Sequence, residues 1–158
     1  MITNLYTAPR CVPPARTWSS NATLTTGTDG HVTVTPMDTT ASFYFFSALF
    51  WNMGDARFGQ YICYLLDLEV SDNINHISIA SGTDLRKGIV SDHTAWVAAC
   101  LTNGGSSVHE LNIQTEHVPY VTLLAFGLYS ADDWKKIRGM MRQGLLNTPI
   151  LEGGMLPV

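Results

Sequence analysis

Most of the chain alternates between short apolar runs and clusters of turn-forming residues, a pattern typical of β-rich proteins. The clearest run is 61–70, in which every second residue from Ile62 onward is apolar, so one face of a strand is expected to enter the core. The other face begins apolar and ends with Asp67 and Glu69, which places its far end in solvent. Further strands are predicted over 22–26, 31–35, 42–50, 74–80, 95–101, 108–115 and 118–128.

Two of these runs predict a β-hairpin. Residues 22–26 and 31–35 are rich in Thr and are joined by the Gly-Thr-Asp-Gly turn 27–30. The aromatic run 42–50 is continuous, which favours a strand buried on both faces, although a short helix has the same pattern. About eight strands at this spacing predict a sandwich or a barrel.

The period changes from two to 3.6 near Ser130, where a helix is predicted to begin and to continue to about Arg142. Ser130 has the side chain of an N-cap, and Asp133 three residues later makes a variant of the capping box. The expected buried stripe is Trp134, Ile137 and Met141. Gly144 is expected to end the helix, because glycine adopts the left-handed conformation required there.

The length of 158 residues and the lack of internal repeats predict a single domain over 1–158. Residues 1–15 contain three prolines and are predicted to be an extended arm. The terminal helix is assigned to 130–143 and an apolar tail to 148–158. Because the arm and the tail would be poorly solvated as free ends, we predict a homo-oligomer that buries them.

Composition limits the classes of partner. Charged residues make up 14% of the chain and the net charge is −4 at pH 7, whereas an average soluble domain has about 25% charged residues. Nucleic-acid binding requires a basic stripe that replaces counterions, so no nucleic-acid partner is predicted. A neutral, hydroxyl-rich surface suits glycans or protein neighbours. The longest apolar run, 43–51, is too short to span a bilayer, and the first residues lack the pattern of a signal peptide, so no membrane insertion is predicted.

No residue pattern predicts catalysis. The chain has no Gly-x-Ser-x-Gly motif, no phosphate loop, and no Cys in an activating sequence context. Asp67 and Glu69 lie about 7 Å apart on one strand face, by the geometry of the pleat. That spacing is more typical of a solvated strand end than of a pair of catalytic carboxylates. We therefore predict that the protein is not an enzyme.

The sequence also predicts no metal site and no cofactor. The histidines match no zinc-binding spacing, although strands distant in the sequence can still bring them together. They are His31, His76, His93, His109 and His117. Turns 28–30 and 52–55 have the oxygen atoms that a structural Ca²⁺ needs, but neither has the spacing of a dedicated calcium loop.

The aromatic residues carry the most useful functional signal. Sugars stack their apolar faces on aromatic rings, while amides, carboxylates and guanidinium groups bind the hydroxyls. The predicted ligand-binding residues are Trp51, Asn52, Asp55, Trp18 and Tyr44. Core packing is the competing interpretation; it is favoured for Trp96 and Trp134, and for Trp51 the two interpretations are evenly balanced.

Three stretches of the chain carry a likeness to known proteins. They are Asn4-Leu5 followed by Trp18, the start Gly59-Gln60-Tyr61 of the central strand, and the end Tyr129-Ser130-Ala131-Asp132-Asp133-Trp134 with Leu151-Glu152-Gly153-Gly154-Met155-Leu156-Pro157. In these stretches the chain resembles the jelly-roll, carbohydrate-binding-module-like domains of phage and prophage minor tail proteins. That family often has aromatic-Asp-Gly-Asp where this chain has residues 151–154, so the role of those carboxylates does not carry over.

The resemblance implies an all-β fold, a jelly-roll β-sandwich of about eight strands with one C-terminal α-helix. It also implies a non-enzymatic module that binds a surface glycan or a host receptor in a phage-derived or cell-surface assembly. Such a protein is made in the cytoplasm without a signal peptide and reaches the outside in a virion. The alternative is a purely structural virion or tail subunit that oligomerises without binding a small ligand. A glycoside hydrolase is the less favoured third interpretation.

Overall fold

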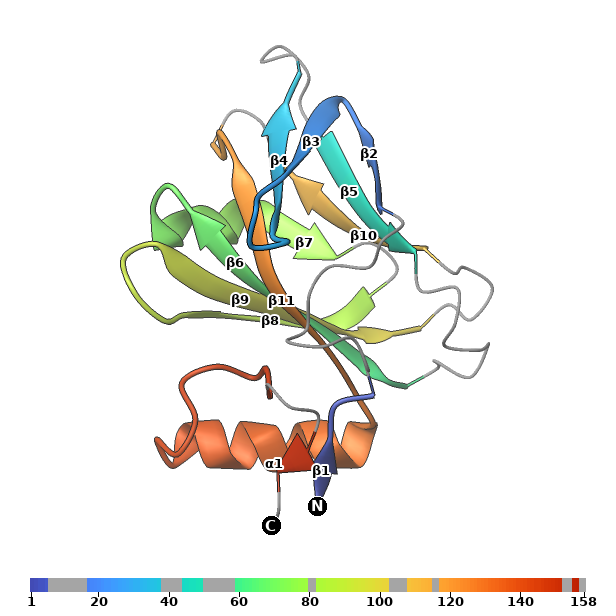
Figure 1. The fold of residues 1–158 in the computed structure, drawn as a ribbon. Helices are drawn as coiled ribbons and strands as arrows, with labels where there is room; N and C mark the ends of the chain where they lie inside the picture. Colours follow the sequence, from blue (N-terminus) through green and yellow to red (C-terminus); the bar gives the residue numbers. More distant parts are fainter. Residues whose placement is uncertain are drawn as a thin grey trace.

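The computed structural model describes residues 1–5, 17–37, 44–49, 59–79, 82–102, 108–114, 117–151 and 155–156. Within them, only the backbone is described for 17–20, 44–49, 108–110 and 155–156. The described residues form twelve β-strands, one 3-10 helix and one α-helix near the C-terminus (Figure 1). The prediction of a mostly β protein that ends in a helix is therefore confirmed.

The largest sheet has six antiparallel strands in the order β3-β4-β11-β6-β9-β8. Its strands are β3 (Ala22–Thr26), β4 (Val32–Pro36), β6 (Tyr61–Leu68), β8 (Gly82–Ile89), β9 (Thr94–Leu101) and β11 (Val121–Tyr129). The central strand β11 pairs with β6 from Val121 opposite Leu68 to Tyr129 opposite Tyr61, with one irregularity in register. This long pairing forms the middle of the molecule (Figure 1).

A four-stranded antiparallel sheet and a two-stranded sheet complete the β-structure. The four-stranded sheet has the order β2-β5-β10-β7. Its strands are β2 (Thr17–Ser20), β5 (Tyr44–Leu49), β10 (Val108–Ile113) and β7 (Ile77–Ile79). The two-stranded sheet pairs β1 (Ile2–Thr3) with β12 (Met155–Leu156), the two ends of the chain.

Buried side chains from the two larger sheets and the helix belong to one hydrophobic core. Its largest fully buried members include Tyr64, Phe126 and Tyr129. The rings of Tyr64 and Phe126 meet edge to face with centroids 4.7 Å apart, an arrangement worth about 0.5 to 1.5 kcal/mol beyond the area it buries. Aromatic packing therefore contributes to the core at the middle of the six-stranded sheet.

The predicted hairpin and the predicted central strand are both confirmed. Strands β3 and β4 pair from Ala22 opposite Pro36 to Thr26 opposite Val32. In β6 the alternating apolar residues are buried as expected, and they are Ile62, Tyr64, Leu66 and Leu68. The strand ends at Leu68, so Val70, predicted to continue this face, is instead 49% exposed.

Two other predictions need correction. The strand predicted over 74–80 is instead the 3-10 helix η2 (Ser71–His76) followed by the three-residue strand β7. The polar residues at the start of η2 favour a turn, and Ile74 is buried from that turn. The sequence also predicted no strand over 82–89, yet β8 pairs with β9 there, with an irregularity in register between Thr83 and Arg86. Pairing with an adjacent strand here overrides the weak β propensity of the glycines in this segment.

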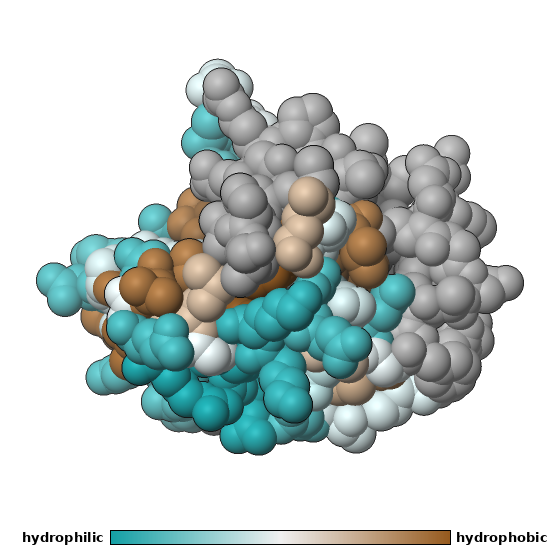
Figure 2. Space-filling view, turned by 90° about the horizontal axis from the view of Figure 1, so that it is seen from below, coloured by the Kyte–Doolittle hydropathy of each residue, from teal (hydrophilic) through white to brown (hydrophobic). Residues whose placement is uncertain are grey.

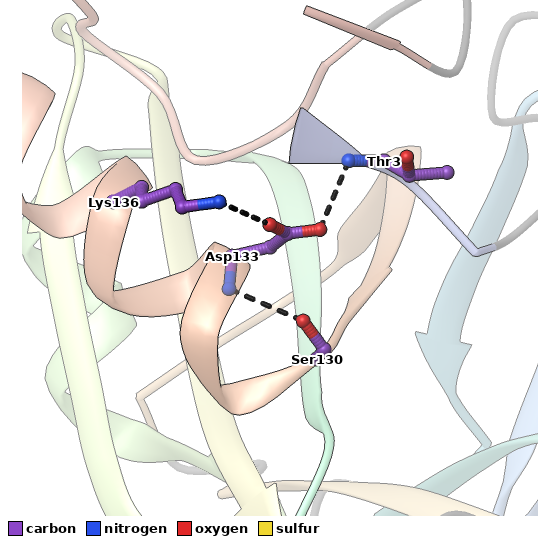
Figure 3. A network of polar contacts seen from close by, with 4 residues as sticks. All are labelled: Thr3, Ser130, Asp133 and Lys136. Carbon is purple, nitrogen blue, oxygen red and sulfur yellow. Dashed lines mark hydrogen bonds and ion pairs between the residues drawn. The ribbon is translucent and has the colours of Figure 1, made fainter. Parts of the chain in front are cut away.

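The helix α1 (Ala131–Arg142) agrees closely with the prediction. The Ser130 hydroxyl accepts a hydrogen bond from the Asp133 N–H at 3.2 Å, which caps the first turn (Figure 3). Trp134 and Ile137 are buried, whereas Met141 is only half-buried. Gly144 follows the helix with φ of 73°. In the described part of the chain, no helix is long and apolar enough to cross a membrane.

Both chain ends pack against the molecule itself. Ile2 is fully buried, and the Thr3 N–H donates to the Asp133 carboxylate at 3.1 Å, with Lys136 on the other carboxylate oxygen at 3.2 Å (Figure 3). The buried Asn4 side chain accepts from the Leu128 N–H at 3.0 Å. Ile2 and Asn4 are therefore buried within one chain. Residues 6–15 of the arm and residues 152–154 and 157–158 of the tail lie outside the described residues, so the homo-oligomer stays a prediction.

Candidate functional site

The residues predicted to bind a ligand fall largely outside the described structure. Trp51, Asn52 and Asp55 all lie outside the described residues. Trp18 is opposite Ser47 in the β2–β5 pair, and Tyr44 of β5 is opposite Ile113 of β10, so these two positions belong to neighbouring strands. The side chains of Trp18 and Tyr44 are not among those described. The predicted stacking site therefore stays a prediction.

A different group of aromatic residues lies where α1 packs against the six-stranded sheet. The rings of Tyr61 and Trp134 stack with centroids 5.0 Å apart and an interplanar angle of 16°. Trp96 meets Trp134 edge to face at 6.3 Å, and the Arg138 guanidinium carbon is 5.8 Å from the centroid of the Trp134 ring. Trp96 and Trp134 are 6% and 4% exposed, which confirms the prediction that both are core residues.

The ring of Trp96 lies over Gly88 of the neighbouring strand. The register places Gly88 directly opposite Trp96. A Cβ added at Gly88 would lie 2.4 Å from the indole nitrogen of Trp96, closer than real contacts allow. The glycine is therefore required by packing, and it lets the indole reach the edge of Trp134.

Three polar side chains adjoin this aromatic group at the edge of the sheet. The Tyr61 hydroxyl donates to Asp84 Oδ2 at 3.0 Å, and Asp84 Oδ1 forms an ion pair with Arg86. Asp84 has φ of 51°, at the irregularity in register between Thr83 and Arg86. Left-handed backbone at a residue other than glycine is uncommon, although Asp tolerates it better than most residues. The side chains of Asp84 and Arg86 are 38% and 50% exposed, so both offer polar atoms to a ligand.

The local electrostatics keep the Tyr61 hydroxyl protonated. Burial, together with the hydrogen bond to Asp84, raises the pKa of Tyr61 from 10.0 to about 12. The phenol therefore stays protonated near neutral pH and donates its hydrogen bond. One oxygen of the Asp84 carboxylate accepts from this phenol, and the other pairs with Arg86. We call Tyr61, Asp84 and Arg86 the edge triad.

The acidic pair at the other end of β6 forms no comparable arrangement. Asp67 is half-buried opposite Thr122 of β11, and Glu69 beyond the strand end is exposed. Burial, and secondarily the charges of Asp67 and Glu69, raises the pKa of the nearby Tyr120. This is the environment of a strand end that opens to solvent, as the sequence indicated.

Comparison with known proteins gives no match: no protein-family model, no curated protein and no solved structure matches the chain.

Sequence reasoning missed the edge triad because 81–84 has the composition of a turn. A usable signal was present. Residues 83–89 divide into two alternating sets that differ in side-chain type. One set contains Thr83, Leu85 and Ile89 together with Lys87, and the other contains the short or charged residues Asp84, Arg86 and Gly88. Such alternation between two turns favours an edge strand, and charged residues are common on edge strands.

Proposed function

We propose that the protein is a non-enzymatic module that binds a carbohydrate, or a receptor that carries one, in a phage-derived or cell-surface assembly. The observation that carries the proposal is the edge triad beside the Tyr61–Trp134 stack. Sugar hydroxyls both donate and accept hydrogen bonds, so they are best bound by neighbouring donors and acceptors held in fixed positions. Arg86 supplies donors and Asp84 supplies acceptors.

The edge triad is held in place before any ligand arrives. The Asp84 carboxylate is bound on both oxygens, and Tyr61 is held by its stack on Trp134. A polar site that is already ordered loses little side-chain entropy when it binds. The half-buried Tyr61 ring and the predicted Trp51 are the two candidate aromatic platforms for the sugar face.

We also propose that the two larger sheets form a jelly-roll sandwich. Strands β4, β11, β6 and β9 lie side by side in the larger sheet, and β5, β10 and β7 lie side by side in the smaller one. This order supports two interlocked Greek keys, in which successive strands alternate between sheets. Strand β8 departs from that order, because it pairs with β9 rather than lying beside β7. An experimental structure that traces 38–43, 50–58 and 103–107 tests whether those connections cross between the sheets.

A glycan-array screen followed by calorimetric titration of the best glycan tests the function. Arg86→Ala is expected to weaken binding by about 1 kcal/mol, the net value of one hydrogen bond, which is a roughly fivefold rise in Kd. Arg142→Ala is the matched control, because it removes the same charge from an exposed position at the end of α1. Its Kd should equal that of the parent.

Trp51→Ala separates the two possible platforms. If Trp51 stacks on the sugar, its removal should cost about 1 to 3 kcal/mol of binding free energy, the scale of a ring stacked on an aromatic side chain. If Trp51→Ala weakens glycan binding and Arg86→Ala does not, the binding site lies at the predicted loop and not at the edge triad. If no glycan binds at millimolar concentration, the proposal is wrong and the structural-subunit interpretation takes its place.

A further inference from the structure

We propose that His76 and His117 form a binding site for a divalent transition-metal ion. His76 is the last residue of η2, and His117 lies in the turn between β10 and β11, so the fold brings together two residues distant in the sequence. Their imidazole rings stack with centroids 4.0 Å apart and an interplanar angle of 20°. His76 is half-buried and His117 is exposed, which leaves the pair open to ions in solution.

Gln114 connects the two histidines and sets the protonation of one ring. His76 Nδ1 lies 2.9 Å from the side-chain oxygen of Gln114. An amide oxygen can only accept, so His76 Nδ1 carries the proton and donates it, and Nε2 keeps its lone pair. Metal-binding histidines have this arrangement, in which the nitrogen away from the metal donates to a carbonyl or carboxylate oxygen.

The backbone fixes the same three residues relative to one another. The Gln114 N–H donates to the His76 carbonyl oxygen at 3.2 Å, and the His117 N–H donates to the Gln114 carbonyl oxygen at 3.2 Å. The positions of both histidines are thus set by hydrogen bonds that do not depend on the imidazoles. The side chain of His117 can turn without disturbing them, because it is exposed.

The ring spacing suits a shared ion. The two rings stack face to face, so a shared ion requires the exposed His117 ring to rotate about its side-chain torsions until one of its nitrogens points at a metal held by His76. Two imidazoles 4.0 Å apart need only this local rotation to share an ion with metal–nitrogen bonds of about 2.0 to 2.1 Å. Within the described ranges, no three His, Cys, Asp or Glu side chains converge, so water completes the coordination.

The donor set identifies the class of ion. Neutral imidazole suits Zn²⁺, Ni²⁺ and Cu²⁺, whereas Ca²⁺ and Mg²⁺ prefer oxygen ligands. Two other histidines offer a contrast. The His31 ring is bound to the Asp29 carboxylate at 3.0 Å, and His93 Nδ1 is 3.2 Å from the Leu68 carbonyl oxygen. Neither of these rings is stacked on a second imidazole among the ring contacts of the described residues.

Calorimetric titration of the untagged chain with ZnCl₂ tests the proposal, with NMR of the histidine side chains to locate the ion. We expect one Zn²⁺ per chain, with the signals of His76 and His117 shifted. His117→Ala should abolish or strongly weaken binding while leaving the far-UV circular dichroism unchanged. His93→Ala is the matched control and should bind Zn²⁺ like the parent.

Gln114 variants give a second and graded readout. Gln114→Leu should weaken Zn²⁺ binding by about tenfold, as loss of the hydrogen-bond partner of a metal-binding histidine does. Gln114→Glu should retain binding, because a carboxylate accepts from the same Nδ1–H. The proposal is overturned if the parent gives no binding heat at millimolar ZnCl₂, or if His117→Ala binds Zn²⁺ with unchanged affinity.

Discussion

At the scale of single residues, the Tyr61 hydroxyl links the core to the exposed edge triad, and its pKa makes a testable prediction. The pKa of Tyr61 is raised from 10.0 to about 12 in the folded protein. The protonated phenol therefore stabilises the fold fully below pH 10, and this contribution is lost as the pH rises through about 12. Absorbance at 295 nm should show a tyrosine ionisation near pH 12 that belongs to Tyr61.

Variants separate this effect from that of Tyr120, whose pKa is also raised. Tyr61→Phe should remove the ionisation near pH 12. The unfolding free energy of this variant should also decrease less than that of the parent as the pH rises above 10. Tyr120→Phe should leave the ionisation near pH 12 in place. If Tyr61→Phe does not change the alkaline titration, the Tyr61 hydroxyl does not make the protected hydrogen bond to Asp84 described above.

Gly88 gives a second residue-scale prediction, because its missing side chain makes room for Trp96. Gly88→Ala would place a methyl group 2.4 Å from the Trp96 indole nitrogen. Overpacking of this kind typically costs about 1 to 3 kcal/mol of unfolding free energy. Urea unfolding monitored by tryptophan fluorescence measures the cost.

Gly139 of α1 is the matched control for Gly88. A Cβ at Gly139 would have no heavy atom within 4 Å, and its backbone is helical. Gly139→Ala should therefore stabilise the protein by about 0.5 to 1 kcal/mol, because alanine is the better helix former. Equal effects of the two substitutions would show that Trp96 is not constrained by Gly88.

At the scale of secondary-structure elements, α1 acts as a clamp on one face of the six-stranded sheet. Trp134 is buried, with its ring stacked on Tyr61 and in edge-to-face contact with Trp96. Trp134→Ala should lower the unfolding free energy by about 3 to 5 kcal/mol, the usual cost of truncating a large buried aromatic side chain. Lys135→Ala changes an exposed position of the same helix and should have little effect. A melting temperature of Trp134→Ala within a degree or two of the parent would mean that the sheets do not need the helix.

The outward face of α1 is polar, as expected for a helix that packs on one side only. Figure 2 shows the molecule from the side that the helix covers in Figure 1, and hydrophilic residues, drawn in teal, gather over a broad part of that face. Its exposed positions include Asp132, Lys135 and Lys136. Arg142 in the last turn complements the helix dipole.

At the scale of the whole molecule, the two chain ends close against each other. Strand β1 pairs with β12, and the N–H of Leu151 donates to the buried Tyr129 hydroxyl at 2.9 Å. Helix α1 covers one face of β6 at Tyr61 through Trp134, and Cys63, two residues further along the strand, is fully buried. Burial also raises the pKa of the Cys63 thiol, which disfavours its reactive thiolate form.

The sequence by itself determined the elements whose signals act over a few neighbouring residues. The period-two pattern of 61–70 predicted β6, the Gly-containing turn 27–30 predicted the β3–β4 hairpin, and the Ser130 cap with the 3.6-residue period predicted α1. In each case the physical cause is local: alternation of side chains along a strand, a glycine at positive φ, or a hydroxyl that accepts from a helix N–H.

Only the tertiary structure decided which distant residues meet. Strand β8 exists because β9 offers it hydrogen-bond partners, and this pairing brings Asp84 to Tyr61. The antiparallel pairing of β7 with β10 likewise brings the ends of η2 and of the 114–117 turn together, so that His76 stacks on His117. Contacts of this kind depend on the order of strands in the sheets, which hydrophobic periodicity does not encode. Both the edge triad and the histidine pair therefore emerged only from the fold.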